Sequence, residues 1–196
     1  MNKDIRMILA SGSPRRRELL TQAGYEYEVI TSDVSEDTDV MQPKDMVMQL
    51  ASRKAFDVFE KEKGTGKLIV IGADTVVSLN NRILGKPYDF DDAYNTLNSL
   101  SGQTHHVYTG VAIIYFDGKE VHSNIFYERT EVEFYLMTHE EIVWYLSTGE
   151  PFDKAGSYGI QGKGGIFVKG IKGDYNNVVG LPLSRIYHEL EQMRYR

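Results

Sequence analysis

The sequence predicts an α/β protein with a mixed β-sheet, and two observations predict this class. Strand and helix patterns alternate over about the first 100 residues, which is typical of parallel βαβ units. Residues 105–136 instead contain two strand patterns joined by the turn sequence Asp-Gly-Lys, which is typical of antiparallel pairing. No repeat with a period of roughly 20–50 residues occurs, so a solenoid or propeller is excluded.

The first part of the chain alternates between strands and helices. A short apolar run predicts a buried strand at 6–10, and alternating residues predict a second strand at 25–32. Ser13 followed by Pro14 predicts a helix start, because Ser is a good N-cap and Pro fits the first helical position. That helix extends to about residue 23, and Pro43 begins a second helix that ends near residue 63. Its buried stripe has helical spacing: Val47, Leu50, Ala51, Ala55, Val58 and Phe59.

Strands dominate the middle of the chain, and helices return towards its end. The predicted strands are 67–79, 82–87, 105–116 and 120–136, the first two joined by a turn at Asn80 and Asn81. A helix is predicted from about Phe90 to Gly102, and another begins at a capping box of Thr138 and Glu141 and stops at Gly149. A glycine-rich segment then runs to Gly180, and Pro182 begins a terminal helix.

Length and composition limit the classes of protein. The 196 residues suffice for one domain or for two closely joined lobes, the smaller around residues 125–180. The absence of cysteine excludes disulfides, thiolate metal sites and a cysteine nucleophile. A net charge of -6 argues against broad nucleic-acid binding. No apolar run approaches the roughly 18 residues of a membrane span, so we expect a cytoplasmic protein with no membrane partner.

Three arginines occupy the first turn of the first predicted helix. Cations there oppose the helix dipole, at about 0.3–1 kcal/mol each. Helical spacing places Arg16 on the buried side, Arg15 at its edge and Arg17 farthest from it. One interpretation is a solvated basic turn. The other is an anion site, since helix N–H groups and arginine forks bind phosphate, and an anion explains the arginines better.

Other charged residues have both structural and functional interpretations. Asp74 interrupts an apolar strand, where it could cap a turn, pair with a buried lysine, hold a metal or orient water. Glu36 lies in an acidic loop, and taken by itself it is more often a surface carboxylate than a ligand. The candidate lysines, each of which alone is more often a surface residue, are Lys54, Lys86 and Lys154.

Two further patterns remain open at this level. Adjacent His105 and His106 point to opposite faces of a strand, so they are poorly placed to chelate one ion. The glycines of "GEPFDKAGSYGIQGKGG" suit either close approach of the backbone to a flat ligand or a set of irregular turns.

Several motifs in one order resemble the Maf family. They are "ASGSPRRRELL", "GADTVV", "LGKP", "LSGQTHHVYTGVA", "TGEPFDKAGSYGIQGKGG" and "GDYNNVVGLPL", spanning about residues 7–184. The resemblance implies a single Maf-like domain over residues 1–196. It also implies a nucleotide pyrophosphatase whose fold is similar to inosine triphosphate pyrophosphatases, with an elongated mixed sheet and a central cleft.

The resemblance also implies roles for individual residues. Asp74 matches the catalytic carboxylate. The phosphate-side and metal-side positions match Ser13, Arg15, Arg16, Glu36, Lys54 and Lys86. The positions that mark a subgroup cleaving dTTP and UTP, as opposed to 7-methyl-GTP, match Arg15, Thr75 and Gln161. The chain departs from the family at Ser35-Glu36, where an acidic pair is usual, and at the two middle residues of "ASRKA".

These matches predict hydrolysis of dTTP and UTP to the monophosphate and pyrophosphate. Mg²⁺ or Mn²⁺ would be held by Asp74 and Glu36, and whether Asp74 is base, metal ligand or both stays open. Two other classes are a non-catalytic nucleotide- or nucleic-acid-binding regulator of cell division and a phosphomonoesterase. We expect no stable nucleic-acid complex, and a homodimer is one assembly that the sequence leaves open.

Overall fold

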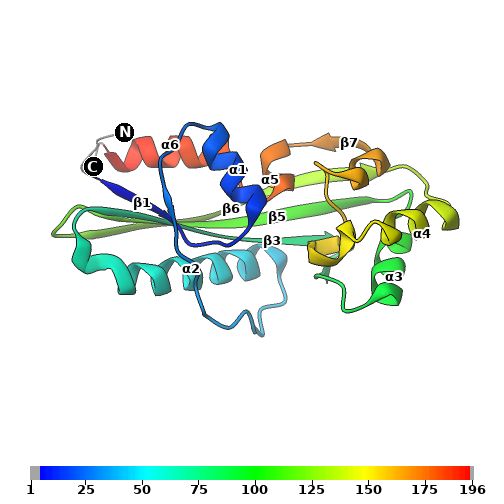
Figure 1. Cartoon of the computed structure of the whole chain (residues 1–196), viewed down its shortest axis with the longest axis horizontal. Coiled ribbons are helices and arrows are strands. Elements are labelled where there is room, and N and C mark those ends of the chain that lie inside the picture. Colours follow the sequence, from blue (N-terminus) through cyan, green and yellow to red (C-terminus); the bar gives the residue numbers. More distant parts are fainter. Residues whose placement is uncertain (1–4, 195–196) are drawn as a thin grey trace. The chain divides into compact units, whose positions relative to one another are not determined.

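The computed structural model describes residues 5–194 and contains a seven-stranded mixed β-sheet (Figure 1). The strand order is β2-β1-β3-β5-β6-β7, with β4 paired to β3. β1 pairs in parallel with β2 and β3, whereas the β3–β4 and β6–β7 pairs are antiparallel. The strands are β1 (Arg6–Leu9), β2 (Glu28–Val29), β3 (Leu68–Leu79), β4 (Arg82–Leu84), β5 (Thr104–Phe116), β6 (Val121–Phe134) and β7 (Val168–Lys172). The predicted α/β class with a mixed sheet is confirmed.

Helices cover the sheet and alternate with its strands. They are α1 (Pro14–Gln22), α2 (Pro43–Glu62), α3 (Phe90–Leu100), α4 (His139–Ser147), α5 (Tyr175–Val179) and α6 (Leu183–Arg194). Short 3-10 helices are η1 (Lys63–Thr65), η2 (Glu150–Asp153), η3 (Ala155–Ser157) and η4 (Lys163–Phe167). The capping box of Thr138 and Glu141 is confirmed, with both reciprocal hydrogen bonds present. Within residues 5–194, no helix combines the length and apolar character needed to cross a membrane.

The structure corrects three local predictions. Only Glu28–Val29 of the strand expected at 25–32 joins the sheet, where it pairs with Ile8 and Leu9, and pairing stops after Val29 because β1 ends at Leu9. Ser13 takes the N-cap position of α1, but its side chain makes no capping hydrogen bond. The glycine-rich segment contains β7 and α5, which the abundance of turn residues concealed.

The chain forms two compact units, and β3, β5 and β6 contribute residues to both. The first unit comprises the chain up to Asp74, Thr109–Glu128 and the chain from Gly180 on. The second unit comprises Thr75–Tyr108 and Arg129–Val179. The smaller lobe expected around residues 125–180 stays a prediction.

Helix α2 lies along the sheet in the first unit (Figure 1), and two strand glycines show how closely its backbone approaches. A Cβ at Gly72 of β3 would lie 2.8 Å from the backbone nitrogen of Ala55 and would collide with the carbonyl of Ala51. A Cβ at Gly110 of β5 would collide with the backbone at Val47. The two glycines therefore let the backbone of α2 approach the strands directly. The core on this face consists of Ile8, Ala10, Ala51, Ala55, Val58, Phe59, Leu68, Val70, Ala112 and Ile114.

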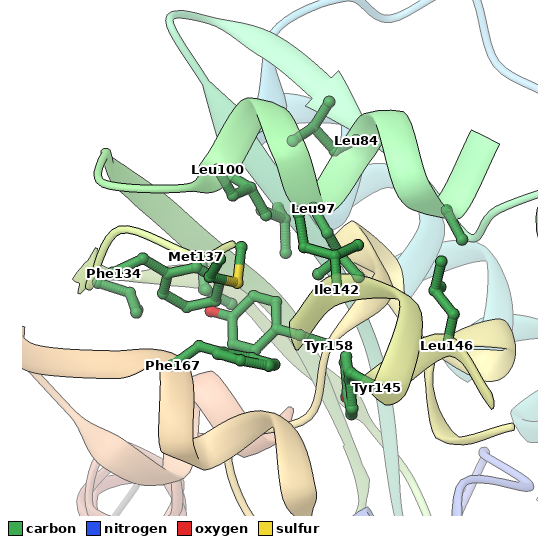
Figure 2. Packing of buried hydrophobic residues seen from close by; sticks show 14 residues of the cluster. Leu84, Leu97, Leu100, Phe134, Met137, Ile142, Tyr145, Leu146, Tyr158 and Phe167 are labelled. Atoms are coloured by element: carbon green, nitrogen blue, oxygen red, sulfur yellow. The ribbon is translucent and has the colours of Figure 1, made fainter. Parts of the chain in front are cut away.

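The core of the second unit is rich in aromatic side chains (Figure 2). Leu97 and Leu100 of α3 and Ile142 of α4 belong to one buried cluster with Phe134 and Tyr158. The Phe134 and Tyr158 rings meet edge to face with centroids 4.8 Å apart, a geometry that aromatic pairs prefer. Tyr158 and Phe167, which lie within the glycine-rich segment, are buried in this cluster and anchor that segment to it.

Candidate active site

A carboxylate–lysine–carboxylate cluster occupies the first unit. Lys54 Nζ lies 2.6 Å from Asp74 Oδ1 and 2.6 Å from Glu36 Oε1. The side chains of Lys54 and Asp74 are 14% and 13% exposed, whereas that of Glu36 is 62% exposed. Pairing with Lys54 therefore offsets the cost of burying Asp74, and Glu36 opens the cluster towards solvent.

The close approach of α2 to β3 explains how this cluster forms. Gly72 and Asp74 are two residues apart on β3, so they lie on the same face of the sheet. Because Gly72 admits the backbone of α2 at Ala51 and Ala55, the neighbouring Lys54 reaches Asp74. The sequence left open whether Asp74 pairs with a lysine, and the structure answers that Lys54 is its partner.

Arg16 lies at the start of α1 and is half-buried. Its Nε donates to the carbonyl of Gly180 at 2.9 Å, and its NH1 group donates to Ser11 Oγ at 3.0 Å. Arg17 is exposed, so the orientations expected for Arg16 and Arg17 from helical spacing are confirmed.

Desolvation lowers the pKa of Arg16 below its ordinary value. Asp74 and Glu36 raise the pKa, and Arg15 lowers it further. A guanidinium stays protonated at neutral pH even so. Arg16 is thus a poorly solvated cation beside a second cation, at a helix N-terminus without a side-chain cap. Such an arrangement favours an anion.

The structure brings together most of the predicted phosphate-side and metal-side residues in one unit. Ser13, Arg15, Arg16, Glu36, Lys54 and Asp74 all belong to the first unit. The three remaining predicted residues, Thr75, Lys86 and Gln161, belong to the second unit. Thr75 follows Asp74 directly in β3 and is half-buried, whereas Lys86 and Gln161 are exposed.

The loop that carries Lys86 is tied to a neighbouring turn. The carbonyl of Gly85 accepts a hydrogen bond of 2.9 Å from the backbone N–H of Gly156. Gly156 has a φ of 67°, and a Cβ there would lie 2.7 Å from a methyl group of Val77. Glycine is therefore required at this position both by conformation and by space.

The remaining candidates make structural contacts. His105 is fully buried, and its Nε2 lies 2.9 Å from the hydroxyl of Tyr158. His106 is partly exposed, and its Nε2 lies 3.9 Å from Glu131. Lys154 donates to Asp153 and to the carbonyl of Glu150. Across residues 5–194, no group of three His, Asp or Glu side chains is arranged to hold a metal ion.

Sequence reasoning missed one set of interactions. The side chain of Glu150 accepts hydrogen bonds from the backbone of Lys163 and Gly164 and from the hydroxyl of Tyr145. A carboxylate at the start of a glycine-rich stretch was the available signal, since such turns offer backbone N–H groups that need acceptors.

The fold and the site define an α/β protein whose first unit contains both the arginines of the first turn of α1 and the carboxylates that Lys54 bridges. Residues 6–193 match the family described as Maf-like protein, and the chain belongs to this family. A Bacillus cereus protein named dTTP/UTP pyrophosphatase is 54% identical over 188 residues, which cover 95% of each chain. Proteins of the same name from Bacillus thuringiensis subsp. konkukian and Bacillus anthracis are each 55% identical over 188 residues, again 95% of each chain.

Two solved structures align with part of the chain. The nucleoside-triphosphatase / dITP/XTP pyrophosphatase of Mycobacterium abscessus is 14% identical, with a TM-score of 0.39 over 66% of this chain and 74% of that one. A HAM1 protein from Coxiella burnetii is 11% identical, with a TM-score of 0.41 over 66% and 73%. These scores are too low to define the fold, which the sheet described above defines directly.

Proposed function

We propose that this protein hydrolyses dTTP and UTP to the nucleoside monophosphate and pyrophosphate. The observation that carries the proposal is the cluster in which Lys54 bridges Asp74 and Glu36, in the same unit as Arg15 and Arg16. The shared name of relatives that are 54–55% identical over 95% of the chain supports the same activity.

The cationic residues bind the triphosphate. A triphosphate carries several negative charges, and Arg15, Arg16, Lys54 and Lys86 neutralise them. Backbone N–H groups of the first turn of α1 add donors, because the Ser13 side chain does not cap them. Since phosphoryl transfer depends mainly on positioning and charge stabilisation, these contacts supply most of the catalysis.

The two carboxylates fit a divalent cation. Mg²⁺ is usually bound by one or two carboxylates together with phosphate oxygens of the substrate, and Asp74 and Glu36 supply two that already share one cation. We infer that they hold Mg²⁺ or Mn²⁺ when substrate is present. The bound ion would neutralise charge on the phosphates and act as a Lewis acid.

Hydrolysis requires a proton acceptor for water. The water oxygen forms a bond to the α-phosphorus, the bond to the bridging oxygen breaks, and pyrophosphate leaves with the electron pair. Lys54 contacts Oδ1 of Asp74, so Oδ2 is the oxygen through which Asp74 would accept the proton. Asp74 acts as base, as metal ligand or as both, and each role needs its negative charge.

The base is read by Gln161, together with Thr75 and Arg15. An amide side chain has both a donor and an acceptor, which match the imide edge that thymine and uracil share. A base with a different edge would leave these groups unpaired, at about 1–3 kcal/mol per group. We therefore expect kcat/KM for dTTP and UTP to exceed that for dATP and dGTP by at least about tenfold.

The test is a substrate panel with the full-length protein. Each nucleoside triphosphate is supplied with Mg²⁺ or Mn²⁺, and pyrophosphate and phosphate are detected separately. Release of pyrophosphate with a preference for dTTP and UTP is the expected result. Release of phosphate alone would point to a phosphatase, and salt-sensitive binding without turnover would point to a nucleotide- or nucleic-acid-binding regulator. Either outcome would overturn the proposal.

A further inference from the structure

The carboxylate of Glu150 holds the turn that carries Gln161. Its Oε1 accepts hydrogen bonds from the hydroxyl of Tyr145 at 2.9 Å and from the backbone N–H of Gly164 at 3.2 Å. Its Oε2 accepts from the backbone N–H of Lys163 at 2.9 Å. One side chain thus satisfies two consecutive backbone donors just after Gln161.

Tyr145 holds the other end of the same turn. Its side chain is fully buried, and its hydroxyl accepts a hydrogen bond of 3.2 Å from the backbone N–H of Gly159 while donating to Glu150. Gln161 is exposed and lies between these two attachments. The backbone on both sides of Gln161 is therefore fixed by one hydrogen-bonded pair of side chains.

The glycines of this segment make room for that pair. A Cβ at Gly162 would lie 2.5 Å from the carboxylate carbon of Glu150, and one at Gly164 would lie 2.5 Å from the hydroxyl oxygen of Tyr145. At these two positions, close backbone approach is to side chains of the chain itself. From the sequence, close approach to a flat ligand was one interpretation of the many glycines. The structure shows that Gly162 and Gly164 instead leave room for the side chains of Glu150 and Tyr145.

The charge of Glu150 suits its role as an acceptor. Burial raises the pKa of Glu150. The N–H groups of Lys163 and Gly164, the Tyr145 hydroxyl and the charge of Lys154 together lower it by more, so the pKa lies below its ordinary value. The ionised carboxylate has only acceptor sites, and three donors face it. In Glu150→Gln the amide NH₂ group would face at least one of these N–H or O–H donors, and that hydrogen bond would be lost.

We propose that Glu150, together with Tyr145, is a positioning residue for base recognition, because it fixes the backbone that presents Gln161. This inference rests on the proposed function, in which Gln161 reads the base. Glu150 itself acts through Gln161, without binding the phosphates. Its loss should therefore weaken discrimination between bases and leave phosphate binding unchanged.

The experiment is a double-mutant cycle of Glu150→Gln and Gln161→Ala, measured as the ratio of kcat/KM for dTTP over dCTP. Cytosine has an amino group and an unprotonated N3 where thymine has a carbonyl and N3–H, so this ratio reports recognition of the imide edge. The wild type should prefer dTTP at least about tenfold. Each single change should lower the ratio roughly 3- to 10-fold, and the double variant should lower it no further than Gln161→Ala alone.

A second readout separates positioning from general damage. Inorganic tripolyphosphate has the phosphates but no base, and its inhibition constant should be the same for the wild type and Glu150→Gln. Amide exchange at Lys163 and Gly164 should be faster in Glu150→Gln. Glu140→Gln makes the same chemical change at an exposed position of the same unit and should leave all these quantities unaltered.

The outcomes distinguish this inference from the proposed function. A wild type that releases no pyrophosphate from dTTP removes the proposed function itself. If the wild type is selective but the effects of the two changes are additive, only the role of Glu150 is overturned. The same holds if Glu150→Gln leaves the dTTP/dCTP ratio unchanged. Should Glu150→Gln fail to fold, Tyr145→Phe replaces it in the same cycle with the same expected results, because it removes the hydroxyl that joins Gly159 to Glu150.

Discussion

Asp74 is a buried carboxylate in a strand whose other buried side chains are almost all apolar. Its negative charge is needed whether it serves as base or as metal ligand. Asp74→Asn keeps the size of the side chain but removes that charge, so turnover should fall at least about 100-fold. The change is checked by steady-state kinetics with dTTP.

Folding should survive this change, because Lys54 keeps Glu36 as a partner. The melting temperature of Asp74→Asn should shift by less than about 4 °C, which corresponds to roughly 1 kcal/mol for a chain of this size. Asp57→Asn is the matched control, since Asp57 also pairs with a lysine, Lys61, at 2.8 Å. Normal turnover by folded Asp74→Asn would refute its assigned role.

The three arginines of α1 should differ in their effects. Arg15→Ala and Arg16→Ala should each greatly reduce kcat/KM, because each would remove a cation of the proposed phosphate site. Arg16→Ala also loses the hydrogen bonds to Ser11 and Gly180, at about 1 kcal/mol each, so its stability should fall modestly. Arg17→Ala is the control and should change neither quantity. Equal losses of activity at all three positions would contradict the anion site.

His105 makes the stability of the second unit sensitive to acid. Burial, with a smaller contribution from His106, lowers the pKa of His105 to about 3, against 6.5 for an exposed histidine. Below about pH 6.5 His105 is therefore protonated in the unfolded chain but stays neutral in the folded chain. The free energy of unfolding consequently falls as the pH decreases from about 6.5 towards 3. Between pH 8 and pH 5 this single group should cost about 2 kcal/mol.

The measurement is urea unfolding of the wild type and of His105→Gln between pH 8 and pH 5. Glutamine can still bond to the hydroxyl of Tyr158 but does not titrate, so the variant should lose about 2 kcal/mol less than the wild type over this range. His122→Gln changes an exposed histidine and should retain the pH dependence of the wild type. An identical pH dependence in His105→Gln would show that His105 is not the responsible group.

Among the elements, the contact between α2 and β3 determines the site. Gly72→Ala places a methyl group against the backbone of α2 at Ala51 and Ala55, which must move away. Overpacking of this kind costs about 1–3 kcal/mol, and the movement should draw Lys54 from Asp74 and lower kcat/KM. Stability and activity should therefore fall together.

Gly64→Ala is the control for this contact. Gly64 lies in η1, directly after α2, and a Cβ there would meet no heavy atom within 4 Å. Its stability should be unchanged or up to about 1 kcal/mol higher, because alanine restricts the unfolded chain. If Gly72→Ala behaved like Gly64→Ala, the close approach of α2 would not be what holds the cluster together.

Over the complete chain, the proposed tasks are divided between two units. The arginines, Lys54 and both carboxylates belong to the first unit, whereas Lys86 and Gln161 belong to the second. Among residues 5–194, two carboxylates, Asp74 and Glu36, pair with Lys54, so tight binding of a divalent cation should require the phosphates of the substrate. The protein should therefore fold without a bound divalent cation.

Removal of divalent cations should therefore stop turnover without unfolding the chain. Excess chelator should abolish pyrophosphate release, and Mg²⁺ or Mn²⁺ should restore it. The melting temperature of the substrate-free protein should be the same with and without chelator. A divalent cation that binds only weakly in the absence of substrate adds little to the stability of the folded chain. Full activity in chelator, or unfolding caused by it, would contradict the two-carboxylate site.

Local sequence patterns were sufficient to predict the long elements and most of the candidate residues. The helical stripe of α2, the Thr138 capping box and the apolar run of β3 depend only on neighbours within a few residues. The position of Asp74 inside such a run was visible for the same reason. The order of motifs that resembles the Maf family likewise needs no coordinates.

Which distant residues meet could be learned only from the folded chain. The pairing of Lys54 with Asp74 depends on a helix and a strand that approach only because Gly72 has no side chain. The short β2 and the strand β7 exist only through their ladder partners, β1 and β6. The hold of Glu150 on the turn around Gln161 likewise joins residues 13 and 14 positions apart. Contacts between distant residues depend on packing in three dimensions, which no local pattern encodes.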